Sequence, residues 1–307
     1  MNRSSVPGRD TMKQNMRQKN MQAYLFLSPF LIFITVLYIL PAILTVIMAF
    51  TSLDSAFIWK FNGINNFRKI LMDPNTPIIA WNTVKYVGIT IFLTVVLDLF
   101  FAIMTTYFIR DERKGNIFKS ILMIPMITPG VVYSVLWLWL LEATPNGLAN
   151  KVYMALGGSE PLNWIAQYPF VIIIAATLLT SIAYGTTVFS SAVKSIPENQ
   201  FRAARVDGAG EWEIVRNIIL PNLRFHITFI ALWETLGLLT NYVTIMLITN
   251  GGPGVQTEVW ALSAYHKAFS DSQYGYGAAI SLVLIVVVMV LMLVIGAVMH
   301  HQEKSRS

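Results

Sequence analysis

The chain has 307 residues, of which 55% are hydrophobic and only 12% are charged. No soluble globular domain has this balance, so the composition predicts an integral membrane protein with several spans. The formal net charge of +6 would suggest nucleic acid in a soluble protein. In a membrane protein, what matters is which loops carry the excess of basic residues. We expect the lipid bilayer, and no nucleic acid, as a partner. Cysteine is absent, which excludes disulfides and thiolate metal sites.

The N-terminal 1–22 segment is polar and basic. It has too few apolar side chains to form a core, so we expect a cytosolic tail at 1–22 and a single transmembrane domain at 23–307. The apolar run at 23–53 is about twice as long as a signal-peptide core and has no small-residue cleavage site. We therefore predict that it remains in the protein as the first spanning helix.

Six apolar stretches reach the roughly 20 residues that a bilayer requires. They lie at about 24–50, 86–109, 120–141, 169–192, 226–249 and 276–299. The sequence thus predicts an all-α integral membrane fold with six transmembrane helices. Pro41 should kink the first helix. Pro125, Pro129 and Gly130 should interrupt the third, since such residues are tolerated where a helix packs on neighbours or lines a cavity.

The basic residues are distributed unevenly between the two sides of this topology. Sixteen of the 22 Lys and Arg residues lie in the two termini and in the loops 110–119 and 193–224, and the other six lie on the opposite side. The positive-inside rule then places both termini and the 193–224 loop in the cytosol. Aromatic residues suited to the opposite interface are Trp59, Trp81, Trp164, Tyr168 and Trp260.

The most polar stretch between two spans is the loop at 195–224. Its pattern predicts two short helices. Ser195 and Glu198 have capping-box spacing, and Pro197 should lie in the first turn, where its missing N–H costs nothing. The first helix should end at Gly208, a residue suited to a left-handed C-terminal stop. A second helical segment is expected from Glu211 until just before Pro221.

Within this loop the motif Ala203-Ala204-x-x-Asp207-Gly208-Ala209, followed by Ile218 to Pro221, resembles the EAA loop of permease subunits in binding-protein-dependent ABC importers. In that family the loop carries a coupling helix that fits a groove of the cytosolic ATPase, so we call 195–224 the coupling loop. The resemblance assigns ATPase coupling to Pro197, Phe201, Arg202, Ala203, Ala204, Asp207, Gly208 and Ala209. The alternative is a surface helical hairpin between two spans.

One residue departs from the family pattern. Arg202 stands where the family usually has glutamate. The family's ion pair, between this glutamate and a basic residue of the ATPase, therefore cannot form here. Either the pair is inverted, with an acidic ATPase residue opposite, or this contact is left to the sister subunit.

Three further segments extend the resemblance to the maltose-type sugar-permease branch of the family: 63–67 (GINNF), 249–253 (TNGGP) and 274–279 (YGYGAA). The glycines and the proline are also explained locally, as turns at helix ends. The resemblance implies an ABC importer type I permease (MetI-like) fold in a bacterial inner membrane. It also implies a second, homologous permease as heterodimer partner, two copies of an ABC ATPase that bind ATP and Mg, and an extracytoplasmic solute-binding protein. No cofactor is expected on this chain.

Two helices carry polar residues at helical spacing at membrane depth. Thr177, Ser181 and Tyr184 follow one another at i, i+4 and i+7 in the fourth predicted helix, and Glu234, Leu238 and Asn241 do so in the fifth. By resemblance these six positions match those that line the mid-membrane sugar site of the maltose-type permease. Hydroxyls, an amide and a carboxylate can pair with the hydroxyls of a polyol. For Thr177 and Ser181 the alternative is ordinary packing of small residues between helices.

The two carboxylates at membrane depth are the most informative single residues in the predicted spans. Glu234 is not expected to face lipid, so it should accept hydrogen bonds from a ligand, pair with a base of the partner permease, or be protonated. It also disfavours an anionic solute such as a phosphoglycerol. For Asp98 we favour a structural partner over solute contact. His226 has no second histidine nearby, so we expect no metal site.

Enzyme motifs are absent from the sequence. It contains no G-x-x-x-x-G-K-[ST], H-E-x-x-H or G-x-S-x-G pattern, so we predict no catalytic residues and an energy source in a partner. The resemblance makes a carbohydrate the expected solute, whereas the residues alone indicate only a polar, uncharged or cationic small molecule. The alternatives are an ABC permease for another polar solute (glycerol phosphate or a polyamine), a stand-alone secondary transporter, for which an inverted repeat would be expected, a membrane-embedded enzyme, or a scaffold or receptor.

Overall fold

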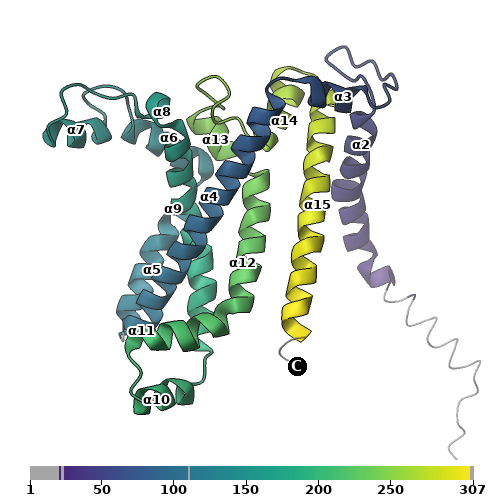
Figure 1. Cartoon of the computed structure of the whole chain (residues 1–307). Coiled ribbons are helices and arrows are strands. Elements are labelled where there is room, and N and C mark those ends of the chain that lie inside the picture. The colour runs from purple at the N-terminus through teal and green to yellow at the C-terminus, as the bar shows by residue number, and fades with distance from the viewer. Residues whose placement is uncertain (1–20, 22–23, 110, 305–307) are drawn as a thin grey trace, which may run out of the picture.

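The computed structural model describes residues 21, 24–109 and 111–304. The predicted tail at 1–22 therefore lies outside the described residues, apart from Met21. Within the described part the chain forms helices and loops, with one isolated antiparallel bridge between Thr51 and Phe61. Figure 1 shows the helices aligned in a bundle, with α10 at one end and α7 and α8 at the other. We call these the loop end and the far end.

The helices follow one another along the chain with short connections. The first half contains a helix at Tyr24–Ala49, which includes η1 (Thr35–Ile39) and α2 (Leu40–Ala49), then α3 (Asn65–Met72), α4 (Thr76–Ile103), η2 (Met104–Phe108), α5 (Glu112–Ile127), α6 (Gly130–Leu140), α7 (Leu148–Ala155) and α8 (Trp164–Gln167). The second half contains α9 (Pro169–Lys194), α10 (Glu198–Val206), α11 (Glu211–Ile214), η3 (Val215–Ile219), α12 (Leu220–Thr240), α13 (Val243–Ile248), α14 (Trp260–Tyr265), η4 (His266–Ser270) and α15 (Tyr274–Lys304).

Four helices of the described chain are long and apolar enough to cross a membrane: Tyr24–Ala49, Thr76–Phe108, Pro169–Lys194 and Tyr274–Ala297. The pair α5 and α6, which together are apolar enough for a fifth span, is bent by 96°, and the predicted interruption of the third apolar stretch is thereby confirmed. The remaining predicted span, the fifth, corresponds to α12, which is not among these helices because Arg224, His226 and Glu234 lower its hydropathy. The η1 π-turn ends two residues before Pro41, which lacks the N–H of a regular helix.

The fifth predicted span differs most from the structure. It was expected as one helix at 226–249, but α12 ends at Thr240 and the shorter α13 begins at Val243. The expectation that the second segment of the coupling loop stops before Pro221 is also wrong. The chain runs from α11 through η3 into α12, and Pro221 lies in the first turn of α12, where its missing N–H is tolerated.

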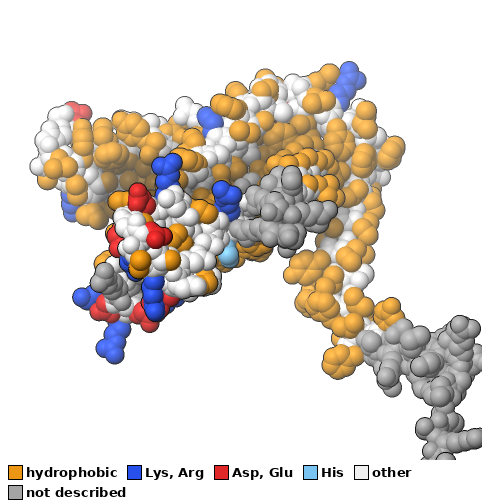
Figure 2. Space-filling model, turned by 60° about the horizontal axis from the view of Figure 1, so that its bottom comes forward, with side chains coloured by type: hydrophobic (Ala, Val, Ile, Leu, Met, Phe, Trp, Pro, Cys, Tyr) orange, Lys and Arg blue, Asp and Glu red, His pale blue; other side chains and the backbone are white. Residues whose placement is uncertain are grey.

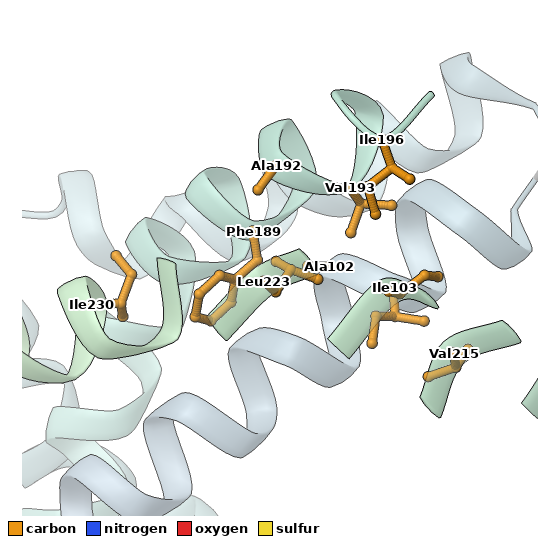
Figure 3. Close-up of a cluster of buried hydrophobic side chains, with 10 residues drawn as sticks. Ala102, Ile103, Phe189, Ala192, Val193, Ile196, Val215, Leu223 and Ile230 are labelled. Atoms are coloured by element: carbon orange, nitrogen blue, oxygen red, sulfur yellow. The ribbon is translucent and has the colours of Figure 1, made fainter. Parts of the chain in front are cut away.

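The helices α4 and α9 form the centre of the bundle. At the loop end they pack with η3 and α12 around a cluster of buried apolar side chains (Figure 3). Its members are Ala102, Ile103, Phe189, Ala192, Val193, Ile196, Val215, Ile219, Leu223 and Ile230. A second cluster, which includes Tyr86, Ile173 and Leu238, joins the same helices nearer the far end. Close packing of this kind is what holds helices together in lipid. The coupling loop is thus attached to the rigid centre of the subunit.

Side-chain amides organise the far end. The Nδ2 atom of Asn66 donates to the carbonyl oxygens of Ala49 and Thr51, at 2.9 and 2.7 Å. These bonds fix the C-terminal end of α2. The N–H of Gly275 donates to the carbonyl of Leu53 at 2.8 Å. Two of the segments that resemble sugar permeases therefore have a local role, which is to join the first and last spans.

A single buried asparagine shapes the loop at 142–168. The Nδ2 atom of Asn150 donates to the carbonyl oxygens of Glu142, Thr144 and Leu162. Its Oδ1 atom accepts from the backbone N–H of Leu162 and from Nε1 of Trp164. Because every polar atom of a fully buried side chain is used, the loop has a defined shape without a core of its own.

Candidate functional site

The coupling loop begins where α9 ends. The predicted capping box between Ser195 and Glu198 does not form, because the Ser195 hydroxyl donates to the carbonyl of Ala192 at 2.7 Å and Ser195 caps the C-terminus of α9. Pro197 is the N-cap residue of α10, one position before the first turn in which it was expected. The helix α10 is nevertheless separated from α9 by only a short link, so it has little freedom to move independently of α9.

The turn after α10 has the predicted left-handed stop. Gly208 has φ +82°, a region that glycine enters without steric cost. The N–H of Ala209 donates to the carbonyl of Ala204 at 2.9 Å, as in a glycine-terminated helix end. The N–H of Gly210 then donates to the side chain of Glu213 at 3.0 Å and starts α11. The alanines and the Asp-Gly-Ala sequence thus build a sharp, fixed elbow.

One face of α10 packs inward and the other is exposed. Phe201 is half-buried against the loop-end cluster, and its ring lies 5.7 Å from that of Tyr107. The opposite face presents Arg202, Ala203 and Val206, and Val206 is 87% exposed. Trp212 of α11 is 73% exposed. Figure 2 shows charged side chains gathered at this end of the molecule around apolar ones. A surface of this kind suits docking to another protein.

The exposed Arg202 has its own acidic neighbour. Its Nη2 atom lies 2.9 Å from the carboxylate of Glu198, one turn earlier on α10. This hydrogen bond lowers the pKa of Glu198 and raises that of Arg202. Both side chains are largely exposed, so the pair contributes little to stability. An approaching partner therefore meets a local ion pair at this position and not an isolated cation.

Polar contacts tie the coupling loop to η2, at the end of α4, and tie α9 to α5. The hydroxyl of Tyr107, in η2, donates a hydrogen bond to the carboxylate of Glu211, and Arg205 donates to the same hydroxyl at 3.4 Å. Lys194, the last residue of α9, forms an ion pair of 2.5 Å with Glu112 at the start of α5. The Tyr107 contacts and the aromatic packing hold α10 and α11 against the end of the α4–η2 span, and the Lys194 pair joins α9 to α5 beside them.

The six predicted solute residues lie on α9 and at the end of α12. Ser181, Tyr184, Glu234 and Asn241 are partly accessible, whereas Thr177 and Leu238 are buried. The ring of Tyr184 lies 6.3 Å from that of Trp233. The structure brings Thr177 and Asn241 together, because the hydroxyl of Tyr86 lies 3.0 Å from Thr177 Oγ1 and accepts from Nδ2 of Asn241 at 3.4 Å.

Tyr86 was missed by the sequence reasoning. The second span was predicted to begin at 86, which placed this residue at the membrane surface. In the structure α4 begins at Thr76, so Tyr86 lies well inside the helix and is fully buried. A buried tyrosine normally has a partner for its hydroxyl, and a correct helix boundary would have identified Tyr86 as a member of the polar group.

The two carboxylates of the spans have different surroundings. Asp98 is fully buried on α4 and accepts hydrogen bonds from Thr186 of α9, so it has the structural partner that was expected. Glu234 is half-buried and makes no hydrogen bond or ion pair within the described residues. A carboxyl group in that position is available to a ligand or to a neighbouring subunit.

Comparison with known proteins decides the family. Residues 98–307 match the family described as the inner membrane component of binding-protein-dependent transport systems. The chain belongs to this family. It is therefore a non-catalytic, multi-pass inner-membrane component of a transport system.

Members of this permease family with named solutes are similar over most of their length. The chain is 28% identical over 263 residues to the trehalose/maltose transport system permease protein MalF of Thermococcus litoralis, which covers 84% of this chain and 86% of that protein. It is 27% identical over 265 residues to the arabinooligosaccharides transport system permease protein AraP of Bacillus subtilis, with 85% and 83% covered.

A solved permease has the same fold. A chain from the crystal structure of a bacterial ABC transporter involved in the import of the acidic polysaccharide alginate superposes with a TM-score of 0.79 at 18% identity. The superposition covers 94% of this chain and 99% of the other. The ABC importer permease fold expected from the sequence is thus confirmed.

Proposed function

We propose that this chain is one of two homologous permease subunits of an ABC importer that moves a carbohydrate into the cytoplasm. A solute-binding protein supplies the carbohydrate, and two copies of an ABC ATPase, which bind ATP and Mg, supply the energy. The names of the relatives support a sugar or oligosaccharide. The observation that carries the proposal is the coupling loop, an exposed short helix on a rigid elbow joined to three spanning helices.

The coupling residues act through this attachment. When ATP binding closes the ATPase pair, a partner that holds Arg202, Ala203 and Ala204 displaces α10. Pro197, Asp207, Gly208 and Ala209 keep the elbow fixed, and Phe201 passes the displacement to the loop-end cluster. Because packed helices move as rigid bodies, α4, α9 and α12 then change their tilt together.

The solute passes the polar residues of α9 and α12 in this mechanism. Ser181, Tyr184, Glu234 and Asn241 offer accessible polar groups, and Tyr86 holds Thr177 and Asn241 in place from behind. Leu238 contributes apolar surface beneath them. Each sugar hydroxyl left without a partner in a dry site would cost about 1–3 kcal/mol, so this set of groups suits a polyol.

The same proposal fixes the orientation. Both termini and the coupling loop lie in the cytosol, since sixteen of the 22 basic residues would then lie inside a bacterial inner membrane. The far end, with α3, α7 and α8, faces the binding protein.

Reconstitution tests this function. The complex is purified in mild detergent, placed in proteoliposomes with the binding protein, and assayed for uptake of maltose, trehalose and an arabinooligosaccharide with ATP inside. We expect co-purification of a second permease and an ATPase, and ATP-dependent uptake of one of these sugars. Uptake by vesicles that contain this subunit alone would overturn the proposal, as would labelling of an Arg205→Cys variant from the outside.

A further inference from the structure

Asp98 makes an unusual contact between the two central helices. It lies on α4, is 0% exposed, and its Oδ1 atom accepts two hydrogen bonds from Thr186 of α9. One comes from the hydroxyl, at 3.2 Å, and the other from the backbone N–H, at 3.1 Å. Thr186 is in the interior of α9, where the N–H would normally serve the helix itself. A side chain of α4 thus engages the backbone of α9.

A glycine makes room for this contact. A Cβ atom added to Gly185 would overlap Oδ2 of Asp98. That oxygen has no hydrogen-bond partner among the described residues, although it is buried. Glycine within a helix is destabilising relative to alanine, and a buried carboxyl group at membrane depth is also costly. The two residues together therefore form a specific fit that ordinary packing would not require.

The contact lies next to the accessible polar residues of α9. Tyr184 directly precedes Gly185, and its ring lies against Trp233 of α12. A bond to the backbone at 186 fixes both the height and the rotation of α9 at this level, because a helix residue is displaced by about 100° for each position along the chain. If the contact were lost, α9 could turn and carry the Tyr184 side chain away from Trp233.

We propose that Asp98 is a positioning residue that fits against Gly185 and binds Thr186, and that it thereby sets the rotation of α9 and directs Tyr184 into the solute passage. The role of Tyr184 in this statement rests on the proposed function. Asp98 itself does not touch solute, since it is fully buried. The contact also makes α4 and the middle of α9 one body, so a displacement of the coupling loop reaches both.

Cysteine labelling tests the orientation of α9. The chain has no cysteine, so a Tyr184→Cys variant of the assembled transporter carries the only thiol of this subunit, and a charged methanethiosulfonate reagent reports its access to water. We expect rapid labelling in the parent, similar labelling with Asp98→Asn, which keeps an acceptor oxygen, and about tenfold slower labelling with Asp98→Ala, which corresponds to 1.4 kcal/mol. Equal rates in all three would overturn the inference.

A double-mutant cycle tests the fit without any cysteine. Gly185→Ala should lower sugar uptake because its Cβ meets the Asp98 carboxyl group, and Asp98→Ala should relieve that clash. The loss of uptake in the double variant should therefore be smaller than the sum of the losses in the two single variants. Gly88→Ala on α4 is the matched control, since its Cβ meets nothing within 4 Å. Additive losses would overturn the inference. A Tyr184→Cys variant that is unlabelled in the parent would contradict the proposed passage, and the cycle would then decide the role of Asp98 independently.

Discussion

The hydroxyl of Tyr107, at the end of the second span, donates a hydrogen bond to the carboxylate of Glu211, which begins the helix after the coupling elbow. The same ring packs on Phe201. This pair connects the coupling loop to α4 directly, in addition to the covalent path through α9. In the proposed mechanism, a displacement of the loop would therefore reach two central helices at once.

We expect Tyr107→Phe to weaken coupling and leave folding intact. The ring contact with Phe201 remains, while the hydrogen bond to Glu211, worth about 1 kcal/mol, and the longer one from Arg205 are lost. Sugar uptake and binding-protein-stimulated ATP hydrolysis should fall about fivefold in proteoliposomes, because 1 kcal/mol corresponds to that factor. Tyr153→Phe in the 142–168 loop is the control, since its hydroxyl has no hydrogen-bond partner among the described residues. An unchanged rate in Tyr107→Phe would contradict this link.

Gly208→Pro should abolish uptake without preventing membrane insertion. Proline fixes φ near −65°, whereas Gly208 has φ +82°, so the elbow cannot form. Ala204→Trp should have the same effect by blocking the approach of a partner. Gly210→Ala is the matched control, because Gly210 has φ −70° and open space around its Cβ position. Normal solute-stimulated ATP hydrolysis in Gly208→Pro or Ala204→Trp would disprove the role of the elbow.

The Arg202→Glu variant tests whether charge on the exposed face of α10 contributes to binding of the ATPase. The change replaces the pair with Glu198 by two like charges at i, i+4, and because both side chains are exposed to solvent the helix itself loses little. If an acidic ATPase residue lies opposite, affinity for the ATPase should fall roughly two- to tenfold at low salt and less at high salt. Arg202→Gln separates loss of charge from its reversal. Unchanged ATPase affinity would mean that Arg202 makes no electrostatic contact with it.

Glu234→Gln separates solute binding from stability. A carboxylate that accepts hydrogen bonds from a sugar contributes about 1.5–3 kcal/mol, so the KM of uptake should rise about tenfold or more. The thermal midpoint of the complex in detergent should not fall, because Glu234 has no partner within the described chain to lose. Thr240→Val is the control on the same helix, since that hydroxyl bonds only to carbonyls of α12. A KM equal to that of the parent would remove Glu234 from the passage.

Asn150→Leu should loosen the far-end loop while the spans stay folded. The change leaves several buried backbone groups without partners, each worth about 1–3 kcal/mol. If the free energy of opening the loop falls by on the order of 3 kcal/mol, the population of the opened loop rises about a hundredfold. Limited proteolysis within 142–168 should accelerate accordingly. Asn146→Ala, at an exposed position of the same loop, should cleave at the parental rate. Equal cleavage of the two variants would show that Asn150 does not organise the loop.

The fold and the coupling elbow were predictable because they depend on local chemistry. Apolar length identifies most spans, and a glycine after an apolar helix face identifies the stop at Gly208. The break after Thr240 was not predictable, since Asn241 and Tyr242 contain neither proline nor glycine and the surrounding residues remain apolar. Only tertiary contacts, such as the bond from Asn241 to Tyr86, account for it.

The docking surface was predicted in part. Val206 is the most exposed of the apolar residues on α10, and it could have been found as the residue one turn after Arg202 on the same face. Tyr107 and Trp212 could not, because their roles depend on how the ends of separate spans meet. The assignments of the six solute residues stay predictions, and the burial of Thr177 and Leu238 favours a supporting position for these two.

The interruption between α12 and α13 has an electrostatic consequence. The final carbonyl groups of any helix lack donors within it and together carry about half a negative charge. Here that pole falls beside Asn241, inside the bundle and not at its surface. If the solute passes here as proposed, this pole attracts O–H and N–H donors and repels phosphates and carboxylates.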